Sequence, residues 1–142
     1  MKTWNQVLNK LLFAVVFMGI TAQPLMALTD SSAPILASGC TDDKFVNGGE
    51  FTEIMTTGSG YTPKCLRVKV GATVSIQASA RHPLIAMASL NGDSANNPFA
   101  ADDKATETQT RQLLEPGVFG FFCASHGKPD GTGMVGIIIV EE

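Results

Sequence analysis

Apolar and polar side chains alternate most regularly in the middle of the chain. Every second residue from Leu66 to Val70 is apolar, charged residues lie between them, and the alternation resumes at Val74 after a turn at Gly71. A period of two predicts half-buried β-strands, because successive side chains of a strand point to opposite faces of its sheet. The β-branched residues and the central glycine disfavour a helix. The residues expected on the core face are Leu66, Val68, Val70, Val74 and Ile76.

Four more strands are predicted from shorter patterns. Residues 51–56 form a strand that ends at a glycine-rich turn, and residues 106–114, rich in Thr and Gln, suit a surface strand. A Pro-Gly turn then leads to an aromatic strand over residues 118–123, and a β-branched strand over 135–140 follows. Many short strands between turns, without a strong helical pattern, predict an all-β fold, an antiparallel sandwich or barrel. One face of the aromatic strand should carry Phe119, Phe121 and Cys123, and the other Val118, Gly120 and Phe122.

The N-terminus has the organisation of a secretory signal peptide. Lys2 and Lys10 flank a polar start, an apolar run follows over residues 11–20, and small residues lead up to Ala27. The apolar run is about half of the roughly 20 residues that a membrane-spanning helix needs, so an anchor is disfavoured. We therefore expect residues 1–27 to be removed during export to the periplasm.

The part that remains after cleavage suits one exported domain. Residues 28–39 are expected to be a flexible lead-in and residues 40–142 the folded domain, which is large enough for a single core. A lipid-anchored Cys40 is the less favoured alternative, because a polar segment separates it from the apolar run. Loss of two lysines lowers the formal net charge from −3 to about −5, which leaves no basic surface for a nucleic acid.

Three cysteines in an oxidising compartment suggest one disulfide and one free thiol. Cys40 and Cys65 are the favoured pair, because both lie near the start of the exported domain while Cys123 lies among other metal-binding side chains. Such a bridge would join the first strand to a later one and stabilise the domain by about 2 to 4 kcal/mol.

Soft metal-binding side chains gather near the C-terminus. The aromatic strand ends at Cys123, His126 follows three residues later, and Met134 precedes the last strand. Sulfur and imidazole favour copper over calcium or magnesium, which take oxygen ligands. Taken singly, these residues have ordinary structural explanations, as small or flexible core residues and a solvated histidine.

The full set of possible metal ligands in the chain favours a metal site. The chain has two histidines, and the upstream one, His82, precedes a proline that should hold it extended at a strand edge or corner. Two imidazoles, one thiolate and a weak axial methionine are the donors of a type 1 copper site.

The segment from Pro116 to His126, followed by residues 131–136, resembles the copper-binding loop of the plastocyanin/azurin family of small blue copper proteins, the cupredoxins. The resemblance is specific over residues 116–140, moderate around His82, and only architectural over residues 40–78. It implies a cupredoxin-like Greek-key β-sandwich. Carried over residue by residue, it also implies that one copper ion is bound by His82, Cys123, His126 and Met134.

Two departures from the family pattern change the expected site. Residues 128–130 lengthen the stretch before Met134, so Met134 could lie farther from the metal or another donor could replace it. Pro83 stands where the family usually has an asparagine whose backbone N–H donates to the thiolate, and a proline has no such N–H. We expect one hydrogen bond fewer to the sulfur of Cys123 and therefore a lower reduction potential.

The resemblance implies a one-electron carrier rather than an enzyme. Its partners would be redox proteins such as a cytochrome or a copper oxidoreductase, and the exposed edge of His126 would face them. The protein is expected to be a monomer without membrane insertion, and no nucleophile with a nearby base supports hydrolysis. Two alternatives remain: a copper delivery or sequestration protein on the same fold, and a metal-free adhesion or structural sandwich.

Overall fold

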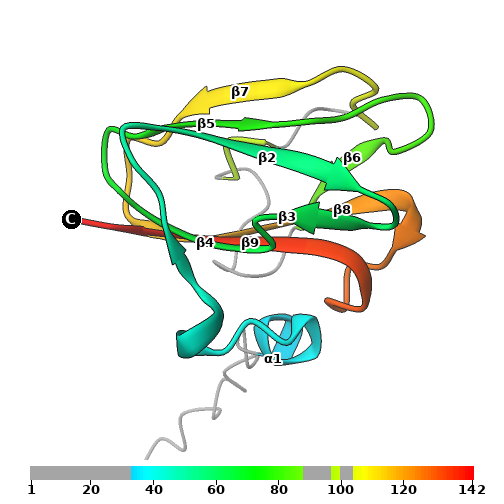
Figure 1. The fold of residues 1–142 in the computed structure, drawn as a ribbon, viewed down its shortest axis with the longest axis horizontal. Coiled ribbons are helices and arrows are strands. Elements are labelled where there is room, and N and C mark those ends of the chain that lie inside the picture. Colours follow the sequence, from blue (N-terminus) through cyan, green and yellow to red (C-terminus); the bar gives the residue numbers. More distant parts are fainter. Residues whose placement is uncertain (1–32, 88–96, 100–103) are drawn as a thin grey trace, which may run out of the picture.

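Nine strands form two β-sheets in the part of the chain that the computed structural model describes, residues 33–87, 97–99 and 104–142. The two sheets face each other as the layers of a sandwich, and a short α-helix, labelled α1 (Ala33–Ser38), lies outside them (Figure 1). The signal peptide expected over residues 1–27 lies outside the described residues. None of the described helices is long and apolar enough to cross a membrane.

The first sheet contains five strands and carries most of the predicted metal-binding residues. Its strand order is β1-β4-β9-β8-β6. The strands are β1 (Val46–Asn47), β4 (Cys65–Lys69), β6 (Leu84–Ala86), β8 (Gly117–Gly127) and β9 (Gly133–Glu141). The long strands β8 and β9 form its centre, and Figure 1 shows β9 leading to the C-terminus.

The second sheet contains four strands in the order β3-β2-β5-β7. They are β2 (Phe51–Thr57), β3 (Gly60–Thr62), β5 (Thr73–Ile76) and β7 (Gln109–Gln112). The predicted sandwich is therefore confirmed, but its strands are not all antiparallel, since β1 and β4, β4 and β9, and β2 and β5 run parallel. The chain crosses to the other sheet between the members of each parallel pair, so no hairpin joins them.

The alternating segment fills the core as its pattern predicts, with one exception. Leu66 and Val68 on β4, and Val74 and Ile76 on β5, are almost fully buried between the sheets. The prediction for Val70 is wrong, because β4 ends at Lys69 and Val70 lies in the turn, where 38% of it is exposed.

The two faces of β8 contact different clusters. Phe119, Phe121 and Cys123 belong to the core between the sheets, whereas Phe122 belongs to a second cluster on the outer face of the first sheet. Both assignments agree with the alternation in the sequence. The second cluster consists of Cys40, Cys65, Met87, Phe122, Val135 and Ile137.

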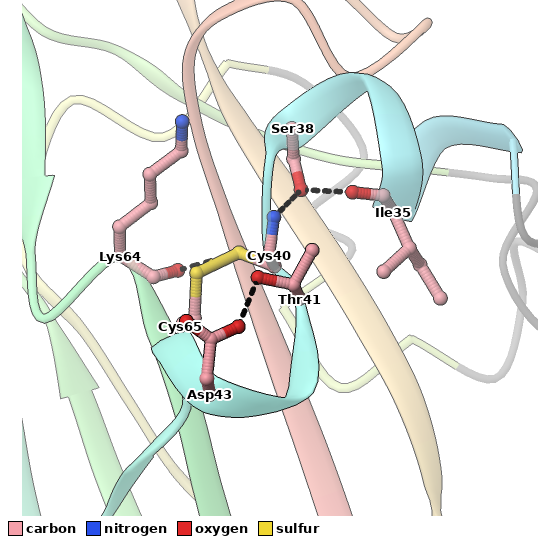
Figure 2. The surroundings of a disulfide bond; sticks show 7 residues. All are labelled: Ile35, Ser38, Cys40, Thr41, Asp43, Lys64 and Cys65. Atoms are coloured by element: carbon pink, nitrogen blue, oxygen red, sulfur yellow. Dashed lines mark hydrogen bonds between the residues drawn. A yellow bond between two sulfur atoms is a disulfide. The ribbon is translucent and has the colours of Figure 1, made fainter.

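A disulfide anchors the start of the domain to the outer face of the first sheet. Cys40 and Cys65 are bonded at 2.03 Å, as the sequence predicted (Figure 2). Residues 33–38, within the expected lead-in, form helix α1 (Ala33–Ser38). The Ser38 hydroxyl donates to the carbonyl of Ile35 and accepts from the N–H of Cys40. A short 3-10 helix, η1 (Asp42–Lys44), leads from the disulfide to β1.

Candidate metal centre

Three metal-binding side chains meet at one end of the first sheet. The sulfur of Cys123 lies 3.9 Å from Nδ1 of His82 and 3.4 Å from Nδ1 of His126. The two imidazole rings are tilted by 39°, with their centroids 5.0 Å apart. All three donor atoms lie within 4.8 Å of one another, so residues 44 positions apart in the sequence converge on one point.

These separations fit a single metal ion. Donors about 2.0 to 2.3 Å from an ion, at angles of 110° to 120°, lie roughly 3.5 to 3.8 Å apart. The two sulfur–nitrogen distances of 3.9 and 3.4 Å are close to that range. Burial is graded, since Cys123 is fully buried, His82 is half-buried and His126 is exposed. One thiolate and two imidazoles are donors that suit copper, and His126 is the most exposed of the three residues.

His82 is held by a turn directly before β6. Its backbone N–H donates to the carbonyl of Ser79 at 3.0 Å, and the N–H of Ser79 donates to the carbonyl of His82 at 3.1 Å. The next residue, Pro83, accepts a hydrogen bond from the N–H of Ala124 at 2.8 Å. His82 therefore lies at a strand corner, as the sequence predicted, and its segment is bonded directly to the residue after Cys123.

Cys123 and His126 point at each other because β8 is irregular between them. Phe122 pairs with Val135 and Gly127 pairs with Gly133, so four residues of β8 lie opposite one residue of β9. In a regular strand, two residues three positions apart would point to opposite faces of the sheet. The prediction that the strand ends at Cys123 and that His126 lies in a loop is wrong, since β8 continues to Gly127.

The lengthened stretch before Met134 forms a closed hairpin tip, which we define as residues 128–132. The N–H of Lys128 donates to the carbonyl of Thr132, and the N–H of Gly131 donates back to the carbonyl of Lys128. Asp130 accepts hydrogen bonds from the hydroxyl and the N–H of Thr132, which hold the pKa of that carboxyl below its usual value. The extra residues are thus taken up by the tip.

The hairpin tip returns the chain to β9 one residue before Met134. Met134 is 1% exposed and belongs to the same core cluster as Cys123. Because the tip closes on itself, the added residues do not carry Met134 to the surface. Its place in the core is compatible with an axial contact, and that role stays a prediction.

The sulfur of Cys123 has no backbone N–H donor in the part of the chain that the structure describes. Its hydrogen-bonding contacts there are the two imidazole nitrogens. Pro83 cannot donate, and its carbonyl is used by Ala124. Among the described residues no other donor contacts this sulfur, and the expected loss of one hydrogen bond stays a prediction.

Tyr61 on β3 is a neighbour of the site that the sequence did not indicate. Its ring meets the ring of Phe121 edge-on at 4.8 Å, and only 4% of the residue is exposed. The hydroxyl has no hydrogen-bond partner among the described residues. Burial, and then the charge of Cys123, raise the pKa of this hydroxyl well above its usual value. In the sequence, the one feature that could have drawn attention to Tyr61 is that it is the single tyrosine of the chain and follows the turn at residues 58–60.

Replacing Tyr61 with phenylalanine is expected to stabilise the protein. The variant keeps the buried ring and removes a hydroxyl whose desolvation is not compensated, so we expect a gain of about 1 kcal/mol at neutral pH. The raised pKa of Tyr61 keeps its proton in the folded state, whereas the unfolded tyrosine ionises near its ordinary pKa of about 10. Wild-type stability should therefore fall as the pH rises above about 10, and this contribution should be missing from Tyr61→Phe.

Urea unfolding of the two proteins between neutral pH and about pH 11 measures this difference. The gap in the free energy of unfolding between Tyr61→Phe and wild type should widen above about pH 10. A gap that stays constant would mean that the pKa of Tyr61 is not raised, and a variant less stable than wild type at neutral pH would mean that the hydroxyl has a partner.

No family model matches the chain, and no curated protein sequence matches it either. Solved structures do resemble it. A copper-containing nitrite reductase from Thermus scotoductus SA-01 has a TM-score of 0.50 and 18% identity, over 71% of this chain and 29% of the reductase. Pseudoazurin from Methylobacterium extorquens AM1 has a TM-score of 0.48 and 19% identity, over 65% of this chain and 76% of its own. A purple cupredoxin from Nitrosopumilus maritimus has a TM-score of 0.44 and 22% identity, over 63% and 99%.

The match to the nitrite reductase bears on the fold. The chain spans less than a third of the length of the nitrite reductase, and at 18% identity the match shows a shared architecture alone. The cupredoxin-like Greek-key β-sandwich that the family resemblance implied is confirmed.

Proposed function

We propose that this chain, which has the cupredoxin fold, binds one copper ion and carries single electrons between redox proteins. His82, Cys123 and His126 would bind the metal, with Met134 as a weak fourth contact. The observation that carries the proposal is the convergence of one buried thiol and two imidazole nitrogens within 4.8 Å of one another. Copper bound there would supply a one-electron couple between its two common oxidation states.

The protein's part in such a reaction is to hold the donors still. Cys123 lies on a central strand of the first sheet, paired to Leu84 of β6 on one side. The bond from Ala124 to Pro83 ties the segments that carry Cys123 and His82 together. Donors fixed by a folded sheet change position little when the charge of the site changes, which keeps the energetic cost of electron transfer low.

His126 gives the site its contact with the outside. It is the exposed member of the three, whereas Cys123 is fully buried. An electron would therefore enter and leave along the imidazole edge, at a surface where a partner redox protein can dock.

Export to the periplasm is part of the proposal. The first 27 residues have the organisation of a signal peptide, and disulfides such as that between Cys40 and Cys65 persist in oxidising compartments.

Voltammetry of the copper-loaded protein separates electron transfer from copper delivery. A carrier should show a reversible one-electron couple and keep its copper in both oxidation states. A delivery or sequestration protein should bind only copper(I), remain colourless and release the metal to a competing copper(I) chelator. The second result would overturn the proposal and favour the delivery role.

Replacing Pro83 with alanine is expected to raise the reduction potential. Alanine restores a backbone N–H at the position where related sites donate to the thiolate, and such a bond weakens the sulfur as a donor to the oxidised metal. A net hydrogen bond of about 0.5 to 1.5 kcal/mol corresponds to about 20 to 65 mV for a one-electron couple.

Pro129→Ala is the matched control for this change. It also adds an N–H in place of a proline, but on the exposed hairpin tip. We expect it to leave the potential unchanged. Equal potentials for Pro83→Ala and wild type would mean that the sulfur does not lack this donor.

A further inference from the structure

Gly127 on β8 and Gly133 on β9 lie at the end of the irregular part of β8. Each of them lies against a backbone carbonyl of the other strand. A Cβ atom on Gly133 would lie 2.3 Å from the carbonyl oxygen of His126. A Cβ atom on Gly127 would lie 2.3 Å from the carbonyl oxygen of Met134. Gly127 follows His126 and Gly133 precedes Met134, so the arrangement is reciprocal, and the two glycines are partners in the β8–β9 ladder.

This crowding is not a general property of the turns in the chain. Gly133 has a positive φ of 80°, and Gly71 has one of 93°. At Gly71, however, a Cβ atom would meet nothing within 4 Å. Gly71 therefore needs glycine for its backbone conformation alone, whereas Gly133 needs it for close contact as well.

We propose that Gly127 and Gly133, here called the glycine clamp, are positioning residues that fix His126 relative to Met134 and Cys123. The proposal rests on the proposed copper site. Without side chains at the clamp, β8 and β9 approach closely enough to bring the carbonyls of His126 and Met134 over the opposite glycine. The irregular segment between Phe122 and Gly127 is then held at both ends by ladder pairs.

A side chain at the clamp would move His126. Ordinary contact between carbon and oxygen requires about 3.5 Å, so a methyl group at position 133 would displace the carbonyl of His126 by about 1 Å. The hairpin tip is closed by its own hydrogen bonds and is poorly placed to absorb that displacement. Ligands of a metal site must be held to within about 0.5 Å, so the donor geometry would change.

Gly133→Ala, compared with the matched control Gly71→Ala, tests the clamp. Both substitutions strain a positive φ, but only the first also meets the carbonyl of His126. In the copper-loaded proteins, Gly133→Ala should change the copper hyperfine splitting in the EPR spectrum and shift the potential, whereas Gly71→Ala should match wild type. In the metal-free proteins, Gly133→Ala should raise the alkylation rate of the Cys123 thiol several-fold over wild type, and Gly71→Ala should not. A Gly133→Ala protein that matches wild type in EPR spectrum and alkylation rate would overturn the clamp.

A second measurement keeps the clamp testable if Gly133→Ala does not fold. In wild-type protein, NMR should detect a strong contact between the α-protons of Gly127 and Gly133, in both the metal-free and the copper(I) forms. Absence of that contact would overturn the clamp. A wild-type protein without a copper–thiolate spectrum would overturn the proposed function. The alkylation and NMR experiments need no copper, so they would still decide whether the glycine clamp exists.

Discussion

Replacing Cys123 with serine should abolish the intense visible absorption of the copper-loaded protein. That absorption requires a bond between copper and a thiolate, and a serine hydroxyl stays protonated and binds copper weakly. Cys123 is the free cysteine of the described chain, since Cys40 and Cys65 are bonded to each other. The substitution conserves shape but buries a hydroxyl, so we expect a loss of stability of about 1 to 3 kcal/mol. Absorption spectra of copper-loaded variant and wild type measure the effect.

Ser125→Ala is the control, because Ser125 lies in the same irregular segment of β8 and is exposed. It should keep the full absorption. A Cys123→Ser protein that folds and retains the band would mean that Cys123 is only a small buried residue. The metal-free adhesion alternative predicts that neither substitution changes any spectrum.

Replacing Phe121 with alanine should cost the fold about 3 to 5 kcal/mol, a large part of the roughly 5 to 15 kcal/mol that stabilises a domain of this size. Phe121 is fully buried, and its ring contacts Tyr61 at 4.8 Å between centroids and lies near Phe99 at 6.5 Å. The substitution would leave a cavity beneath the strand that carries Cys123 two residues later. Urea unfolding of the metal-free proteins gives the free-energy difference.

Phe51→Ala is the matched control for the loss of a phenyl ring. Phe51 lies on the outer face of β2 and is 63% exposed, so its removal should change the free energy of unfolding by no more than about 0.5 kcal/mol. Equal losses for the two variants, or a loss below about 1 kcal/mol for Phe121→Ala, would contradict the packing of the core described above.

The alternation of side chains predicted which face of a strand is buried, but not which strands pair. Leu66 and Ile76 could be placed in the core from sequence because a period of two has one physical explanation. The parallel pairing of β4 with β9 could not, because it depends on contacts between segments far apart in the chain. Val70 was misplaced for a local reason, since the pattern continues through it although the strand ends at Lys69.

The candidate site was predictable in composition and only partly in geometry. Two histidines and one unpaired cysteine could be counted, and the resemblance supplied their roles. The irregularity that turns His126 toward Cys123 has no signature in an alternation pattern, because it is defined by the register against β9. The longer stretch after His126 left the place of Met134 open, and the closed hairpin tip explains how Met134 nevertheless returns to the core.

A copper titration of the wild-type protein, followed by absorption and EPR spectroscopy, tests the central claim most directly. If His82, Cys123 and His126 hold a type 1 site, the titration should end at one copper ion per chain. The loaded protein should show an intense copper–thiolate band and the narrow copper hyperfine splitting of a strongly covalent site. A colourless protein, or weak absorption with the wide splitting of copper bound to nitrogen and oxygen alone, would contradict the account.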